Sequence, residues 1–302
     1  MNTPFFYTRR IYKLYGLRKA AYFWLQTQRL GRPLASWFDF IENALPSGVT
    51  EIYKIRLAMR PAFRFINPRF ALKDRLAALT CHYGIFKEKF TAAARARLLS
   101  EDSGCRLAEI TGKSGAAYFI ETRGAVTKEG VIRILMIDGA TGFNLAILAG
   151  ILAPDGKGGL SFCIGMLRGP GQIVTDGKDM VVRVTKDLNG LRPKQAVLHA
   201  AAALAEWCGA KEIVAPATDS EIAIKNWFKG RKVLANHDPF WQEFAPARAN
   251  DGLYHLPLPL PRRDEKDVQQ KRRKDWRARY AHIDAFSAAV KSALDALARP
   301  AP

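Results

Sequence analysis

The amino-acid sequence predicts an α+β fold: a helical N-terminal domain, a mostly antiparallel mixed sheet with covering helices, and a basic C-terminal helix. Apolar residues recur at three-and-four spacing up to about residue 100, short β-rich runs separated by glycine follow residue 105, and a charged, alanine-rich segment follows residue 261. The 302 residues, 48% of them hydrophobic, suffice for about two domains of roughly 100–200 residues each. We therefore expect the chain to divide into 1–104, 105–261 and 262–302.

The N-terminal domain is predicted to be helical and basic from residue 5 onward. Its strongest helical runs are 18–30, 34–44 and 72–83. Pro61 and Pro68 frame an aromatic segment that cannot be helical throughout, because proline removes a backbone donor and restricts the residue before it. We expect an extended connector there.

The second domain opens with β-rich runs that are joined by short, glycine-containing connections. The runs are 105–110, 116–122, 130–137, 146–152 and 160–167. The connection over 124–130 has the length of a hairpin loop rather than of a crossover. These runs predict an antiparallel meander.

A strong helix is predicted over 193–208, with Pro193 in its first turn and Gly209 just past its end. A short buried strand at 211–216 follows, and this helix-to-strand step suits a sheet covered by a helix. The remaining expected elements are helices near 220–228 and 239–244, a strand at 253–258, and a C-terminal helix with a basic outer face to about residue 297.

The composition indicates the kind of partner. Forty-seven Lys and Arg against 28 Asp and Glu give a net charge of +19 and a pI near 10.0, which favours an anionic partner: a phosphate-bearing donor, an anionic lipid or nucleic acid. The cysteines are Cys81, Cys105, Cys163 and Cys208. They form no C-x-x-C pair, so we expect buried free thiols rather than a zinc or dithiol site.

The sequence shows neither a secretory signal nor a run of about 18 apolar residues. We therefore expect a cytoplasmic protein without a transmembrane segment, one able to lie against the inner membrane. The aromatic residues of the first 24 positions alternate with basic ones. Core packing is the first interpretation of that pattern, an anionic surface the second and base stacking the third.

A phosphate site is predicted at the mouth of the 193–208 helix. Gly190 lies in a turn just before the helix, where backbone N–H groups meet the positive end of the helix dipole. The surrounding candidates for binding the donor are Arg168, Gly169, Arg183, Lys186, Arg192 and Lys194. The alternative is a tight turn with a solvated basic rim. No Walker-type or G-x-G-x-x-G motif occurs at this point.

The acid–base candidates are Glu129 at the start of a strand, and His237 and Glu243 before the last strand. For His237 and Asp238 the simpler interpretation is a turn with an N-cap before a short helix. His82 and His199 are interpreted as structural and packing residues. No metal or nucleophile signature is present, so a hydrolase with a standard triad is disfavoured.

Several separate blocks, in order from about residue 34 to 280, resemble the VirK/YbjX family of bacterial proteins. The blocks include Met59-Arg60-Pro61, Cys81-His82-Tyr83, Glu129-Gly130, Ile164-Gly165, Gly190-Leu191-Arg192-Pro193-Lys194, Phe240-Trp241 and Arg272-Arg273. The resemblance implies a role in virulence, in tolerance of cationic antimicrobial peptides through envelope remodelling, or in a DNA-damage response. It carries no reaction. Arg168 stands where the family usually has glutamine, and Asn189 where it usually has histidine.

The expected order of elements is also similar to the N-acetyltransferase-type (GNAT-like) acyltransferase fold, although the Q/R-x-x-G-x-G/A signature is absent. In that fold a glycine-bearing turn before the central helix binds the pyrophosphate of an acyl carrier. The leading hypothesis is therefore acyl or aminoacyl transfer from coenzyme A or an acyl-carrier thioester, acting in envelope modification or stress tolerance. The alternatives are a non-enzymatic basic protein that binds nucleic acid or an anionic membrane surface, and an adaptor without activity.

Overall fold

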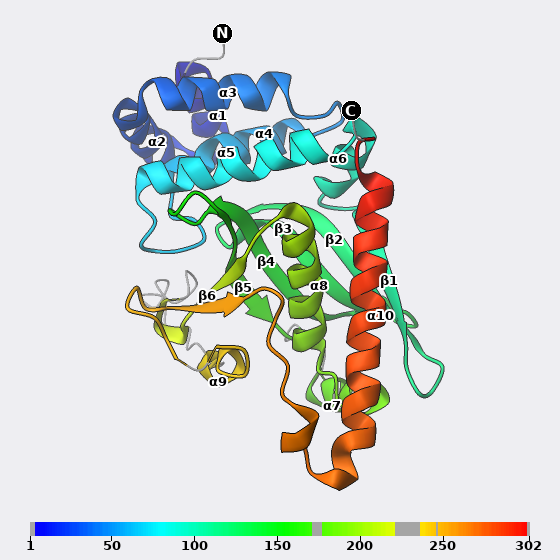
Figure 1. The fold of residues 1–302 in the computed structure, drawn as a ribbon. Helices are drawn as coiled ribbons and strands as arrows, with labels where there is room; N and C mark the ends of the chain where they lie inside the picture. The colour runs from blue at the N-terminus through cyan, green and yellow to red at the C-terminus, as the bar shows by residue number, and fades with distance from the viewer. Residues whose placement is uncertain (1–3, 171–176, 221–235, 246, 301–302) are drawn as a thin grey trace.

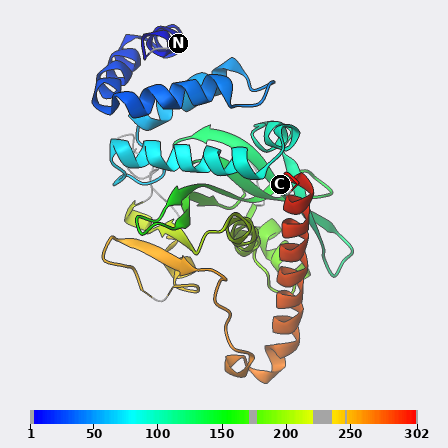
Figure 2. The same ribbon diagram turned by 45° about the horizontal axis from the view of Figure 1, so that its top comes forward.

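A computed structural model describes residues 4–170, 177–220, 236–245 and 247–300. It confirms the α+β class, with helices packed around one mixed sheet and a long C-terminal helix along its edge (Figure 1). Figure 2 shows the sheet between the N-terminal helices and the helix that follows the meander. No helix among these described residues is long and apolar enough to cross a membrane.

The N-terminal helices pack side by side at one end of the molecule. Their bounds are α1 (Pro4–Tyr15), α2 (Leu17–Leu30), α3 (Arg32–Asn43), α4 (Glu51–Met59), α5 (Leu72–Lys89) and α6 (Ala92–Leu98). The three predicted helical runs are confirmed. The segment between Pro61 and Pro68 contains only a 3-10 turn (Arg60–Ala62) and then irregular backbone, as the two prolines predict.

The sheet has the strand order β1 to β7, the order of the sequence. Its strands are β1 (Cys105–Thr111), β2 (Ala117–Thr127), β3 (Gly130–Asp138), β4 (Asn144–Pro154), β5 (Leu160–Arg168), β6 (Glu212–Pro216) and β7 (Leu253–Pro257). The first five strands form the predicted antiparallel meander, β6 pairs parallel to β5, and β7 pairs antiparallel to β6. Strand β4 is buried along nearly its whole length because both α5 and α8 pack on it.

The crossover from β5 to β6 contains two helices, α7 (Gly177–Asp187) and α8 (Pro193–Cys208). Helix α8 is the predicted alanine-rich helix. Helix α7 was not predicted, because only Met180 and Val184 of its residues are buried and its other positions are largely polar. Helix α9 (Asp238–Trp241) is shorter than expected, and most of the helix expected at 220–228 lies outside the described residues.

Helix α10 (Arg273–Leu297) runs beside α8 and β1, burying Ile283, Phe286, Val290 and Leu294 against them. Its far end is attached to the N-terminal helices, because the backbone N–H of Arg299 donates to the carbonyl oxygen of Lys89 at 2.8 Å. The buried side chains of the helices, the sheet and α10 form one continuous hydrophobic cluster. The domain boundaries at 104 and 261 stay a prediction.

The four cysteines are free. Cys105, Cys163 and Cys208 are buried and Cys81 is half-buried, which agrees with the expected thiols. Burial raises the pKa of both the Cys163 and the Cys208 thiols to about 12. These thiols therefore stay protonated and unreactive at neutral pH.

Candidate functional site

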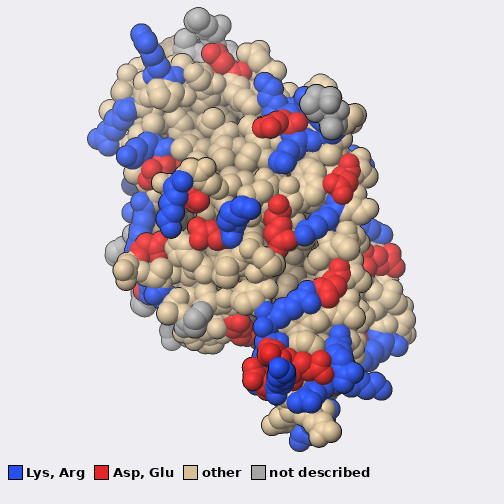
Figure 3. Space-filling view, viewed as in Figure 1, with Lys and Arg blue, Asp and Glu red and all other residues tan. Residues whose placement is uncertain are grey.

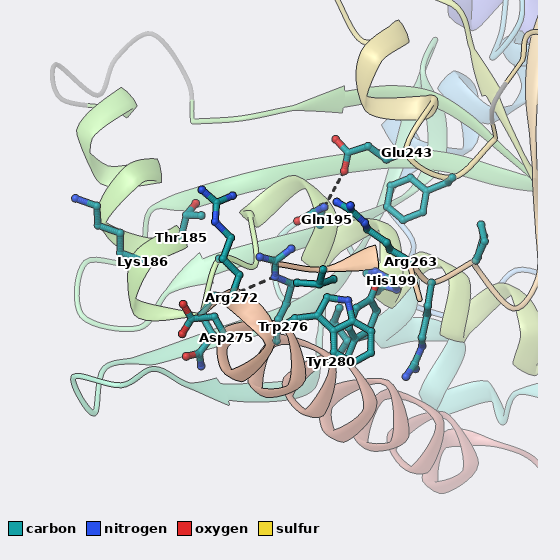
Figure 4. A pocket seen from close by; sticks show the side chains of 18 of the residues that line it. Thr185, Lys186, Gln195, His199, Glu243, Arg263, Arg272, Asp275, Trp276 and Tyr280 are labelled. Atoms are coloured by element: carbon teal, nitrogen blue, oxygen red, sulfur yellow. Dashed lines mark hydrogen bonds between the residues drawn. The ribbon is translucent and has the colours of Figure 1, made fainter. Parts of the chain in front are cut away.

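A cavity of about 950 Å³ lies between the α7–α8 turn and the first half of α10 (Figure 4). Its basic lining residues are Lys113, Lys186, Arg262, Arg263, Arg272 and Arg279, and its acidic ones are Glu243 and Asp275. Figure 3 shows the same crowding of charged side chains at the end of the molecule where the segment before α10 lies. The cavity is therefore suited to an anionic ligand.

The wall formed by the α7–α8 turn depends on two residues in the left-handed region of backbone conformation, Asn189 with φ 54° and Gly190 with φ 83°. A Cβ atom at Gly190 would lie 2.5 Å from Nη2 of Arg279. The side chain of Asn189 bonds to Nε2 of His282 at 2.9 Å, with Nδ2 facing the ring nitrogen. Glycine and asparagine thus allow α10 to approach the turn closely.

The first turn of α8 is already occupied by a carboxylate. Gln195 donates from Nε2 to Glu243 at 3.0 Å (Figure 4), and Nη2 of Arg192 bonds both carboxylate oxygens of Glu243. The guanidinium of Arg192 also lies 5.5 Å from the ring centroid of Phe240. The carboxylate of Glu243, which lines the cavity, therefore lies at the positive end of the α8 dipole. The sequence had predicted a bound phosphate at this position.

Four cations of the lining have no carboxylate partner in the described part of the chain, and two of them, Arg263 and Arg279, donate to the backbone carbonyl oxygens of Asp267 and Asn189. Lys186 on α7 and Arg272 just before α10 form no ion pair there, whereas Lys113 lies 3.8 Å from Asp275. Arg262 is held by Asp284. Lys186 and Arg272 are thus the lining charges most available to a ligand.

Aromatic groups of α10 form another wall. The rings of Trp276 and Tyr280 have centroids 4.7 Å apart, and the guanidinium of Arg262 lies 4.9 Å from the Tyr280 centroid. The indole N–H of Trp276 is buried and meets no acceptor among the residues that are described. The exposed faces of these rings, rather than this buried N–H, are the surfaces that a ligand in the cavity can contact.

A second, smaller cavity of about 340 Å³ adjoins the first along α8 and α10, and the Arg262–Asp284 ion pair lies where they meet. His199 lines both cavities, with its ring edge-on to Phe244 at 5.9 Å. Burial, together with the charge of Arg262, lowers the pKa of His199 to about 4. The imidazole is therefore neutral at pH 7 and can both donate and accept a hydrogen bond.

The predicted site residues lie in different places. Of the predicted donor-binding residues, Lys186 and Gly190 line the large cavity. Glu243, predicted as an acid or base, lines it too, and Arg192 reaches it through Glu243. Arg183, which shares α7 with Lys186, is exposed and outside the lining. Sequence proximity alone did not distinguish these positions.

Lys194, Gly169 and His237 form a separate group. Nζ of Lys194 lies 3.1 Å from Nε2 of His237, and a Cβ at Gly169 would lie 3.9 Å from Lys194 Cε. The backbone N–H of His237 donates to Thr218 Oγ1. The predicted side-chain N-cap of α9 is not formed, because the carboxylate of Asp238 instead accepts from the backbone N–H of Thr218, which begins a 3-10 turn after β6.

Glu129 lies in the β2–β3 turn, where Arg168 Nη2 is 3.9 Å and Lys128 Nζ 3.8 Å from its carboxylate. Burial lowers the pKa of nearby Arg60 to about 10, and the charge of Glu129 opposes that shift. Neither Glu129 nor Arg168 lines the large cavity.

Sequence reasoning missed the contribution of the C-terminal segment to this site. The missed lining residues are Arg262, Arg263, Arg272, Trp276, Arg279 and Tyr280. A signal was present, because Trp276, Arg279 and Tyr280 have the three-and-four spacing that places side chains on one face of a helix.

Comparisons with known proteins place the chain in a family. Residues 13–292 match the family described as "Protein of unknown function (DUF535)". An uncharacterized protein, YbjX, of Escherichia coli K12 is 25% identical over 268 residues, which cover 87% of this chain and 80% of YbjX. An uncharacterized protein of Haemophilus influenzae is 30% identical over 127 residues, 40% of each chain. No solved structure matches. The chain therefore belongs to this family of unknown function, the VirK/YbjX family that its sequence blocks resemble.

Proposed function

We propose that the protein is a transferase that binds a phosphate-bearing donor in the large cavity between the α7–α8 turn and α10. The observation that carries the proposal is the charge of the lining: six cations face two carboxylates, and Lys186 and Arg272 have no carboxylate partner within the described chain. Guanidinium and ammonium groups gathered in a shielded concavity bind phosphate more strongly than the same groups do on open surface.

Coenzyme A is the donor class that suits both walls. Its phosphates would lie among Lys186, Arg272 and Arg279, and its adenine against the aromatic rings of Trp276 and Tyr280. A lining of fixed charge alone would suit any polyanion, whereas aromatic faces beside the charges favour a ligand with a planar base.

The order of elements supports acyl transfer at the level of fold analogy. An antiparallel meander ends in β5, which pairs parallel with β6, and α8 lies between them in sequence as the central helix does in N-acetyltransferase-type enzymes. This chain departs from that pattern in two ways. Helix α7 is inserted before α8, and Glu243 occupies the first turn of α8. We therefore assign the donor phosphates to the α7–α10 wall.

In the proposed reaction the nucleophilic nitrogen or oxygen of an acceptor attacks the carbonyl carbon of the thioester. The C–S bond breaks, the acyl group passes to the acceptor, and the proton lost by the acceptor ends on the released thiol. The lowered pKa of His199, about 4, makes its imidazole too weak a base to hold this proton, so we assign His199 a hydrogen bond that orients the acceptor. The family resemblance favours an acceptor of the bacterial envelope.

Calorimetric titration with coenzyme A tests the proposal. The double variant Lys186→Ala with Arg272→Ala should raise Kd at least about tenfold, because two charges that contact phosphate are removed. The matched control removes two exposed lysines outside the lining, Lys157→Ala with Lys178→Ala, and should leave Kd nearly unchanged. Equal affinity of both double variants would exclude the cavity as the donor site. Binding of short DNA in place of coenzyme A, lost steeply as salt rises, would favour the nucleic-acid alternative.

A further inference from the structure

Helices α1 and α2 expose large apolar side chains away from the body of the protein. Their inward faces bury Tyr7, Ile11 and Phe23. Outward, Leu17 is 71% exposed, Phe5 66% and Leu25 63%, and Tyr12, Leu14 and Trp24 are exposed as well. Soluble monomers rarely gather so many large apolar groups on one surface without a partner for it.

The same two helices carry positive charge, most of which has no ion-pair partner in the described chain. The first 38 residues contain seven Lys and Arg and no Asp or Glu: Arg9, Arg10, Lys13, Arg18, Lys19, Arg29 and Arg32. Arg10 is paired with Glu51 of α4. Arg9, Lys13, Arg18 and Arg29 form no ion pair within the described chain, and Figure 3 shows basic side chains projecting where α1 and α2 lie.

The two kinds of side chain share the outward faces. On α1, Phe5, Arg9 and Tyr12 are exposed at positions i, i+4 and i+7, which one helix face holds. On α2, Arg18, Leu25 and Arg29 do the same at i, i+7 and i+11. Long basic side chains can lie along an apolar surface while their charged ends reach lipid phosphates.

We propose that the outward faces of α1 and α2 dock the protein onto an anionic lipid bilayer, with the leucines and aromatic rings in the interface and the basic residues on the headgroups. The positive charge of these two faces favours an anionic bilayer over the other candidate partners. A second copy of the chain would bring two basic faces together, which repels them. Nucleic acid would bind the charges and rings, but it would leave Leu17 and Leu25 in water. The proposal is independent of the coenzyme A site.

Sedimentation with vesicles of phosphatidylcholine, with and without phosphatidylglycerol, tests the docking surface. The unaltered protein should bind only the vesicles that contain phosphatidylglycerol, less so as salt rises. Leu17→Ser with Leu25→Ser should reduce the partition coefficient at least about tenfold, because each leucine would otherwise leave water. Arg18→Glu with Arg29→Glu should reduce it similarly. The control, Phe143→Ser with Val182→Ser, removes two exposed apolar side chains from other elements and should bind like the unaltered protein.

All six substituted residues are exposed, so circular dichroism should show an unchanged fold. Fluorescence provides a second measurement, because Trp24 is exposed in solution and its emission should shift to the blue on vesicle binding. That shift should be lost in Trp24→Phe. Equal binding to uncharged vesicles, or unchanged binding of the leucine variant, would overturn the proposal. So would binding to DNA but not to vesicles, or a dimer that the leucine substitutions dissociate without any vesicle binding.

Discussion

Arg279 of the C-terminal helix donates from Nε to the carbonyl oxygen of Asn189, 3.3 Å away, and its guanidinium fills the space that any side chain at the next residue would need. This contact joins residues 90 positions apart. It fixes the distance between the α7–α8 turn and α10, and so the width of the basic cavity.

Gly190→Ala should destabilise the protein for two reasons, a left-handed backbone and a clash with Arg279. Gly209→Ala is the matched control, because Gly209 has φ 96° and an added Cβ atom would meet no heavy atom within 4 Å. The control should lose about 1–2 kcal/mol, and Gly190→Ala slightly more, because the flexible end of Arg279 must move aside and give up its bond to Asn189. Urea unfolding measures both. If the two variants lose the same free energy, Arg279 does not constrain the turn, and adding Arg279→Ala should then rescue nothing.

Glu243→Gln should tighten coenzyme A binding by a few-fold, because the substitution removes a negative charge from the cavity wall while Gln keeps an oxygen that can accept from Arg192. Calorimetry at low salt measures the change. Glu88→Gln, an exposed position of α5, removes the same charge elsewhere and should leave Kd unchanged. Weaker binding in Glu243→Gln would indicate that its carboxylate contacts the ligand directly.

Acid should destabilise the protein through its buried histidines. Burial lowers the pKa of His82 from 6.5 to about 3, and Nδ1 of its neutral ring accepts from the backbone N–H of Leu152 at 3.3 Å. The unfolded chain therefore binds a proton below pH 6.5 that the folded chain refuses until about pH 3. Stability should fall as pH drops through this window, by about 2 kcal/mol from this histidine at pH 5.

His199, whose pKa is lowered to about 4 by burial first and by Arg262 second, should add to the loss in the same direction. Urea unfolding at pH 7 and pH 5 measures the sum. His199→Gln should reduce the dependence on pH, since one titrating group is removed. A stability that is flat between these two pH values would contradict the burial of both rings.

Alanine substitution at two further glycines should have opposite effects on the stability of the protein. A Cβ at Gly165 on β5 would lie 2.2 Å from the carbonyl oxygen of Glu129, so Gly165→Ala should force the β2–β3 turn away and destabilise the sheet. Gly84 lies inside α5 with open space around it, so Gly84→Ala should stabilise by about 0.5–1 kcal/mol. Thermal unfolding compares the two, and the order of melting temperatures should be Gly84→Ala above unaltered above Gly165→Ala.

Local pattern was enough to predict much of the fold. The periodicity of 18–30 and 72–83, the glycine-separated strands and the Pro193 to Gly209 helix all appear in the structure, because each depends on neighbours in sequence. Helix α7 was missed because its polar residues hide its apolar positions. Because α7 itself was not predicted, the sequence could not indicate which face of this helix points toward the cavity. Lys186, which lines the cavity, was therefore not distinguished from the exposed Arg183.

The site was less predictable than the fold because its walls come from distant parts of the chain. Lys186 and Gly190 were expected to face a ligand, but the partner wall is α10, which lies far along the chain. Glu243 was expected to act as an acid or base, yet Arg192 and Gln195 hold its carboxylate. Such pairings depend on how α8, α9 and α10 pack, which no local pattern in one sequence specifies.

The contact of Arg299 with Lys89 attaches the far end of α10 to the N-terminal helices, so α10 can pack in place only after those helices and the sheet have been synthesised. Chains fold from the N-terminus as they emerge, so the helices and the meander can form while α10 is still being synthesised. The aromatic wall, formed by Trp276 and Tyr280 of α10, is synthesised after the sheet and the α7–α8 turn. A nascent chain in which α10 has not yet been made would hold a sheet and a turn but no closed basic cavity, so ligand retention would report that α10 has been synthesised and packed.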